Sequence, residues 1–293
     1  MKVQEFHYAQ AFDRNLGWLT PEEQKRLQNS RVAIAGMGGA GGVEAQALAR
    51  LGVGGFKIAD QDTFELSNFN RQTGATTETL GESKVKVLRK MILSINPEAQ
   101  VETFQARISK ENIDSFLQSV DLVIDGIDFF EHEAKFLLFQ KSFESGLPAI
   151  TSCPLGFGAS LITFSPHGMR ARDYFDLREG MNEMEQRLAL AFGLSPSALC
   201  LEYMNPKALN LEEGRASSVF PGLLLVGALT AAEAVKILTG KERVYPCPHI
   251  YQIDLLTQQV RRNYYSWGMG SPWLRLKRRL LFQWWNRGKK RNS

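Results

Sequence analysis

The stretch RVAIAGMGGAGGVEAQALARLG, residues 31–52, decides the fold. Its opening residues, 32–37, are apolar and predict a buried strand. Residues 36–42 then contain five glycines, and the residues after them place apolar side chains at helical spacing up to Gly52. A strand, a glycine-rich turn and a helix, in that order, typically open a nucleotide-binding α/β sheet.

Short apolar strands and amphipathic helices alternate through the first half of the chain. Further strands are predicted at 55–60, 99–105, 120–128 and 147–153, and further helices at 81–95, 109–119 and 129–146. This alternation predicts a Rossmann-like, mostly parallel, doubly wound sheet of the α/β class.

The pattern changes after the fifth predicted strand. Residues 155–166 and a hairpin-like pair of strands at 249–262 predict an antiparallel extension of the sheet. A long apolar helix is predicted between them, at 222–240.

We expect the chain to form one main domain with a short appendage. The domain covers residues 1–260 and contains a divergent segment, 166–218, in which one helix is predicted at 179–193. Residues 261–293 form a basic, Trp-rich tail.

The glycine-rich turn predicts a phosphate site. Gly36, Gly38, Gly39 and Gly41 carry no side chain, so the backbone can approach an anion closely at the positive end of a helix. Asp60, at the end of the second predicted strand, is placed to accept hydrogen bonds from a ribose. These residues indicate a nucleotide, although a glycine turn that only packs a helix against a strand would show the same pattern.

A second group of polar residues indicates what happens to the nucleotide. Asn68 and Arg71 lie just past the second strand, Lys84 begins the next helix, and Asp128 ends the fourth predicted strand. Cations neutralise charge that develops on phosphate oxygens, and a carboxylate can hold Mg²⁺. Hydride transfer does not require this set, so the residues favour reaction at a phosphorus atom of a bound nucleoside phosphate.

At this point the sequence resembles the ThiF/MoeB/HesA family, whose members are relatives of the ubiquitin-activating enzymes. The resemblance covers about residues 8–165 and 218–260. It is carried by GMGGAGG at 36–42, ADQD at 59–62, LSNFNRQ at 66–72, LGESKV at 80–85, DGID at 125–128 and FDRN at 12–15.

The resemblance implies an ATP-dependent adenylyltransferase that activates a carboxylate and releases pyrophosphate. The usual substrate in the family is the C-terminal glycine of a ubiquitin-like or sulfur-carrier protein, and a peptide or small acid would also fit. Matched position by position, the motifs imply Gly39 at the phosphates, Asp60 at the ribose, Asn68, Arg71 and Lys84 at the phosphate chain, Asp128 at the magnesium, and Arg14 reaching the active site of the other subunit of a homodimer.

The sequence departs from the family in three places. Phe129 stands where many members have an asparagine, so one polar contact near the adenosine is missing. The paired cysteines of a zinc site are absent, so no zinc is expected. No cysteine closely precedes the helix at 222–240, and Cys200 lies too early in the divergent segment to be a good candidate nucleophile. We therefore expect adenylation without a covalent thioester.

Cysteine usage and charge suggest where the protein works. Three separated cysteines and no signal-like N-terminus favour the cytoplasm. All 31 acids but only 25 of the 35 Lys and Arg lie in residues 1–254, so residues 255–293 carry ten cations and no acid. With its Trp and Leu residues, this tail suggests peripheral membrane contact or docking of an acidic partner more than nucleic-acid binding.

Two other functions stay open on sequence grounds. One is a dinucleotide-dependent oxidoreductase, which the glycine turn alone would allow. The other is a non-catalytic relative that binds a nucleotide or a ubiquitin-like protein, which Phe129 and the divergent segment would allow.

Overall fold

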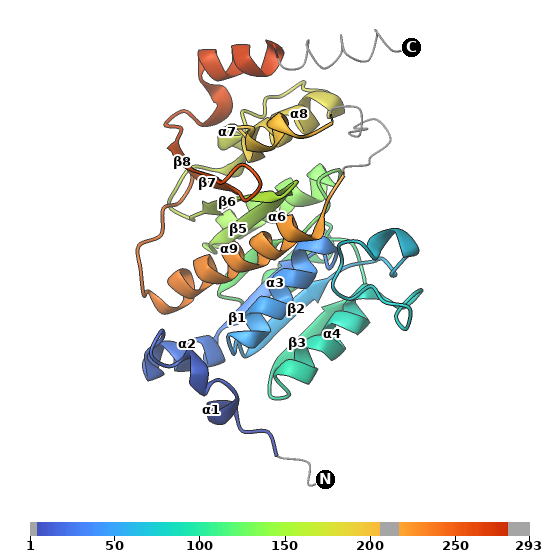
Figure 1. The fold of residues 1–293 in the computed structure, drawn as a ribbon. Coiled ribbons are helices and arrows are strands. Elements are labelled where there is room, and N and C mark those ends of the chain that lie inside the picture. The colour runs from blue at the N-terminus through green and yellow to red at the C-terminus, as the bar shows by residue number, and fades with distance from the viewer. Residues whose placement is uncertain (1–4, 206–216, 281–293) are drawn as a thin grey trace.

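The computed structural model describes residues 5–205 and 217–280, and its centre is an eight-stranded sheet (Figure 1). The strands run in the spatial order β3-β2-β1-β4-β5-β6-β7-β8. Their bounds are β1 (Arg31–Ala35), β2 (Gly55–Ala59), β3 (Gln100–Phe104), β4 (Leu122–Asp125), β5 (Ala149–Leu155), β6 (Gly158–Phe164), β7 (His249–Asp254) and β8 (Gln259–Tyr264). The first five strands in this order, β3, β2, β1, β4 and β5, pair in parallel. The strands β6, β7 and β8 extend the sheet in antiparallel pairing. This arrangement confirms the predicted fold class.

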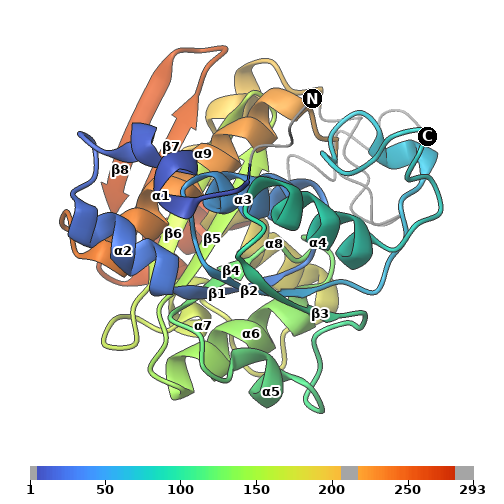
Figure 2. The same cartoon turned by 90° about the horizontal axis from the view of Figure 1, so that it is seen from below.

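Helices cover both faces of the sheet (Figure 2). On one face lie α3 (Gly39–Arg50), α4 (Lys84–Ile95) and α9 (Phe220–Thr239), together with α1 (Tyr8–Ala11) and α2 (Pro21–Asn29) near the N-terminus. On the other lie α5 (Ile113–Leu117), α6 (His132–Glu144) and α7 (Ala171–Tyr174). The helix α8 (Glu183–Leu194) packs against α6 and β6. Short 3₁₀ turns are η1 (Asp13–Asn15), η2 (Leu66–Asn68), η3 (Leu199–Glu202) and η5 (Gly268–Gly270).

The alternation of side chains along β1 explains the two layers. Val32 and Ile34 belong to the core cluster shared with α3 and α4, whereas Ala33 and Ala35 belong to the cluster shared with α5 and α6. Successive side chains of a strand point to opposite faces, so an unbroken apolar run is buried on both sides.

The helix α9 is the one helix in the described ranges that is long and apolar enough to cross a membrane. Half of its most apolar 18-residue window is buried inside the fold, and the helix packs against α3, β5 and β6. Its composition is therefore explained by its place in the core.

Three sequence expectations need correction in detail. The fourth strand ends at Asp125, so Asp128 lies in the following loop and not at the strand end. The helix expected at 109–119 is only Ile113–Leu117. The helix of the divergent segment begins at Glu183, because Asn182 caps it by accepting a hydrogen bond from the backbone N–H of Glu185.

The C-terminal tail is more closely tied to the body than its composition suggests. The boundary placed after residue 260 falls inside β8, and residues 272–280 form a further helix. Arg275 and Arg278 of this helix pair with Asp176, so these two cations face the protein. Residues 281–293 of the tail and residues 206–216 of the divergent segment lie outside the described residues.

The glycine turn after β1 packs directly against the loop after β4. Gly36 has a φ of +89°, and a Cβ there would overlap the carbonyl oxygen of Gly126. A Cβ on Gly41 would overlap the carbonyl oxygen of Gly36. These glycines are therefore required by backbone contacts of the turn itself.

We predict that Gly41→Ala destabilises the protein by ~1–3 kcal/mol, the usual cost of overpacking, even though alanine favours helices. Gly39→Ala adds the same methyl group in the same helical turn, where it meets the end of the Leu223 side chain and no backbone atom closer than 3.7 Å. Urea unfolding of both variants checks this, and equal stability of the two variants would contradict the packing role of Gly41.

Candidate active site

A cavity of about 1190 Å³ opens where the parallel strands reach their carboxyl ends. Most of the predicted site residues line it: Gly36, Gly38, Gly39, Asp60, Arg71, Lys84 and Asp128. Gly41, Asn68 and Arg14 do not. The topology therefore gathers residues from four separate stretches of sequence around one space.

The helix α3 begins at the edge of this cavity. Gly38 is its N-cap and Gly39 its first residue, so the unpaired N–H groups and the positive end of a 12-residue helix lie beside two cavity-lining glycines. This arrangement suits a phosphate group.

Asp60 holds the turn in shape. One carboxylate oxygen accepts the backbone N–H of Met37 at 2.6 Å, and the other accepts the N–H of Asp62 at 2.8 Å. Burial raises the pKa of Asp60, while these hydrogen bonds and the charge of Lys84 act in the opposite direction. Asp60 also lines the cavity, where its remaining lone pairs could meet a ribose.

Two cations stand beside the turn. Lys84 is buried, and its ammonium group donates to the half-exposed carboxylate of Asp62 at 3.1 Å. The guanidinium of Arg71 donates to the carbonyl oxygen of Ser67 at 2.9 Å and to the side-chain oxygen of Asn70 at 3.0 Å. Both groups are fixed by neighbouring polar atoms, so their charge is pre-positioned at the cavity wall.

Asn68 has a local structural contact where a phosphate contact was expected. It is buried, and its side-chain oxygen accepts the backbone N–H of Glu65 at 3.0 Å across the turn η2. In this position the amide shapes the loop that carries Arg71.

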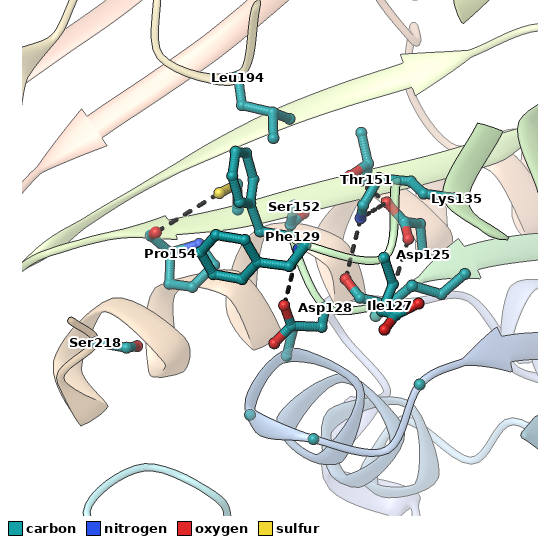
Figure 3. Close-up of a pocket in the computed structure, with 18 of the residues that line it drawn as sticks. Asp125, Ile127, Asp128, Phe129, Lys135, Thr151, Ser152, Pro154, Leu194 and Ser218 are labelled. Atoms are coloured by element: carbon teal, nitrogen blue, oxygen red, sulfur yellow. Dashed lines mark hydrogen bonds and ion pairs between the residues drawn. The ribbon is translucent and has the colours of Figure 1, made fainter. Parts of the chain in front are cut away.

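Asp128 lies on the cavity side of the loop after β4 (Figure 3). One of its carboxylate oxygens accepts the N–H of Phe130 at 2.9 Å. The described residues contain no cluster of three or more His, Cys, Asp or Glu able to hold a metal. A single exposed carboxylate still fits Mg²⁺, because this ion is commonly held by one or two carboxylates plus substrate phosphates and water.

Sequence reasoning missed a buried polar cluster under Asp128. Asp125 is 1% exposed and accepts hydrogen bonds from the ammonium of Lys135 on α6 and from the hydroxyl of Thr151 on β5 (Figure 3). Lys135 also donates to the carbonyl oxygen of Ile127 at 3.1 Å. The cluster therefore holds the loop that presents Asp128, and the signal for it was Lys135 at helical spacing from the buried Leu138 and Phe139 on α6.

A second missed group is Glu44, which lies on α3 and is fully buried. Its carboxyl group accepts a hydrogen bond from Thr230 of α9 at 2.8 Å, and Thr230 is 2.7 Å from the hydroxyl of Ser152 on β5. Burial raises the pKa of Glu44 to about 8, helped by the nearby carboxylate of Asp125. Glu44 is thus protonated in the folded protein at neutral pH.

The raised pKa of Glu44 gives a pH prediction. The folded state binds a proton that the unfolded chain releases above about 4.5, so this contribution to stability is lost as the pH rises through about 8. Glu44→Gln mimics the protonated group. We expect the free energy of unfolding of this variant, measured relative to wild type, to be ~3–5 kcal/mol higher at pH 9 than at pH 5. Unfolding curves at both pH values measure this difference.

Glu133, an exposed residue of α6, provides the control. Glu133→Gln should leave the pH dependence of stability unchanged. If Glu44→Gln also left it unchanged, that result would contradict buried protonation of Glu44.

Cys200 and Cys153 both line the cavity, but neither is an activated thiol. Burial raises the pKa of each, so the thiolate form is disfavoured. The candidate nucleophile Cys200 therefore lacks the electropositive environment that a catalytic cysteine needs.

Phe129 has a packing contact in place of the polar one expected from the family. It is partly buried against the core shared with α6 and meets Phe130 edge-on, with ring centroids 5.1 Å apart. Its ring lies beside Asp128 in the cavity (Figure 3).

Comparisons with known proteins agree with this geometry. The model of the ThiF family matches residues 12–265. A sulfur carrier protein adenylyltransferase of Thermus thermophilus is 30% identical over 244 residues, which are 83% of this chain and 81% of the relative. Among solved structures, PaaA has a TM-score of 0.66 at 21% identity and covers 90% of this chain and 75% of its own. Escherichia coli MccB with ATP has a TM-score of 0.62 at 17% identity, and the match covers 86% of this chain and 68% of the MccB chain.

Proposed function

The chain belongs to the ThiF family, and from that premise we propose that it is an ATP-dependent adenylyltransferase that activates a carboxylate. The observation that carries the proposal is the cavity in which the N-terminus of α3, Arg71, Lys84 and Asp128 meet. The carboxylate belongs to the C-terminus of a ubiquitin-like or sulfur-carrier protein or of a peptide. The adenylyltransferase named among the relatives and the ATP-bound neighbour support this proposal.

In this reaction the substrate supplies the nucleophile. An oxygen of its carboxylate attacks the α-phosphorus of ATP, a new P–O bond forms, and the bond to the pyrophosphate group breaks. The products are an acyl-adenylate and pyrophosphate. Because no proton needs to be removed from the carboxylate, the protein has to position two anions and stabilise the charge that develops between them.

The predicted site residues that line the cavity have distinct tasks in this scheme. The N-terminus of α3 binds phosphate oxygens, and Lys84 and Arg71 offset negative charge on the phosphate chain. Asp128 would hold Mg²⁺, which neutralises charge on the triphosphate when it is bound. Asp125 and Lys135 keep the loop of Asp128 in place. A thioester is not part of the scheme, because burial disfavours the thiolate of Cys200.

We predict that Arg71→Ala and Asp128→Ala each slow ATP–pyrophosphate exchange by roughly 10²-fold or more, the effect of losing one preorganised charged group. Exchange of labelled pyrophosphate into ATP is measured with a panel of small ubiquitin-like proteins and peptides that have free C-termini. Lys86→Ala removes an exposed cation from α4, two residues after Lys84, and should exchange like wild type.

The same assay separates the rival functions. Exchange at the wild-type rate in both variants would refute the assigned roles. ATP binding without exchange for any substrate in the panel would favour a non-catalytic relative. Tight binding of NAD(P)H with no binding of ATP would favour an oxidoreductase.

We further propose that the active enzyme is a homodimer in which Arg14 completes the site of the other subunit. Arg14 is exposed on η1 and does not line the cavity of its own chain. A residue placed in this way could reach a nucleotide only from a neighbouring copy.

Subunit complementation tests this arrangement. Arg14→Ala and Asp128→Ala should each be nearly inactive, whereas two differently tagged variants expressed together should regain about a quarter of wild-type activity, because half of the dimers are mixed and one of their two sites is intact. Activity in the mixture no higher than in the separate variants would show that Arg14 does not act across the dimer.

A further inference from the structure

In addition to Lys84 and Arg71, a positively charged side chain reaches the cavity from the C-terminal helix, residues 272–280. Arg278 of this helix lines the cavity and its side chain is 14% exposed. Two residues just before Arg278 fasten the helix to the body: Arg275 binds Asp176, and Lys277 donates to the carbonyl oxygen of Pro196 at 3.0 Å. Arg278 is therefore held at the wall of the cavity.

The charge around Asp176 is unbalanced. Its carboxylate, 4% exposed, accepts hydrogen bonds from Arg275 at 2.7 and 3.1 Å and from Arg278 at 2.9 Å, and it lies 3.7 Å from Arg178. One carboxylate thus faces three guanidinium groups. Arg178 and Arg275 are partly exposed to solvent, whereas Arg278 carries its charge into the protein.

Three polar atoms of cavity-lining residues are buried and have no hydrogen-bond partner within the described ranges: Nη1 of Arg278, Oγ of Ser195 and Oγ of Ser218. The first two belong to the part of the cavity beside the C-terminal helix. Ser195 directly precedes Pro196, to which the C-terminal helix is bonded. A buried N–H of a charged group without a partner is costly, so both atoms indicate that a ligand completes this part of the cavity.

The place of Arg278 in the cavity favours a contact with the substrate over one with the nucleotide. The phosphate end of the cavity already has Lys84, Arg71 and the N-terminus of α3. Arg278 lines another part of the cavity, together with apolar residues of α8 such as Leu188, Ala191 and Phe192. In Figure 1, α8 lies between α3 and the red C-terminal helix, so this helix lies on the far side of α8 from α3.

We propose that Arg278, assisted by Ser195, binds an acidic side chain of the substrate in the segment that leads to the reacting C-terminus. A carboxylate matches the fork of a guanidinium, and it would balance the positive charge left around Asp176. This inference rests on the proposed carboxylate activation, and it narrows the substrate to proteins or peptides with Asp or Glu close to their C-terminus. The basic helix thus serves substrate selection.

Binding of short peptides tests the proposal. The probes are acetyl-Ala-Ala-Ala-Gly peptides in which Glu or Gln replaces one alanine at a time. Calorimetry measures their affinity for the full chain holding a nonhydrolysable ATP analogue and Mg²⁺. We expect Glu at one position to bind roughly tenfold to hundredfold more tightly than Gln, the effect of a charge-assisted hydrogen bond.

The variants identify the residue responsible. Arg278→Gln should remove the preference for Glu while leaving affinity for the ATP analogue unchanged, and Ser195→Ala should reduce it severalfold. Ser195→Ala keeps every ion pair of Asp176, so it stands as an independent test if Arg278→Gln lowers the melting temperature. Arg279→Gln, a change at the exposed neighbouring position, should retain the preference.

The proposal is overturned if wild-type protein shows no preference for Glu, if none of the peptides binds, or if Arg278→Gln weakens the ATP analogue and not the acidic peptide. Failure of the proposed function is a separate result, because it shows as absence of binding to the ATP analogue or of pyrophosphate exchange in the wild type.

Discussion

The backbone contact between the glycine turn and the loop after β4 is the constraint on which the rest of the site depends. Gly36 and Gly126 meet so closely that a Cβ on Gly36 would overlap the other residue. Their contact places the N-terminus of α3 and the loop of Asp128 at the same cavity. Without it, the phosphate-binding end of the helix and the candidate magnesium ligand would belong to separate surfaces.

Buried polar groups keep this contact in place. Asp60 fixes the turn through the N–H of Met37, while Asp125 and Lys135 fix the loop on the other side. Asp60, Asp125 and Lys135 each have a hydrogen-bond partner, which is the condition for keeping a charge inside a protein. These hydrogen bonds position the groups around the expected nucleotide site, as electrostatic catalysis requires.

Most of the fold could be predicted because its signals are local. The period of apolar residues gives β1 and α3, and the glycines between them mark the turn. Asp60, Arg71, Lys84 and Asp128 could be assigned to one site because parallel strands bring their carboxyl ends to one edge. The family resemblance added the reaction, which no spacing of residues could supply.

Most of the missed features depend on contacts between distant segments. Lys135 finds Asp125 only when α6 packs on β4, and Glu44 meets Thr230 only when α3 packs on α9. Asn68 matches a family motif, yet its amide bonds the turn that contains it, a choice that the sequence does not reveal. The composition of the basic tail suggests contact with a membrane or an acidic partner. Nothing near the tail in sequence indicates that Asp176 binds Arg275 and Arg278.

The most direct test of the central claim is a crystal structure with Mg²⁺ and a nonhydrolysable ATP analogue. The account predicts the triphosphate at Gly38 and Gly39, Lys84 and Arg71 within ion-pair distance of its oxygens, and Asp128 at the magnesium. A triphosphate bound elsewhere, or one at the turn with these three side chains directed away from it, would contradict the account.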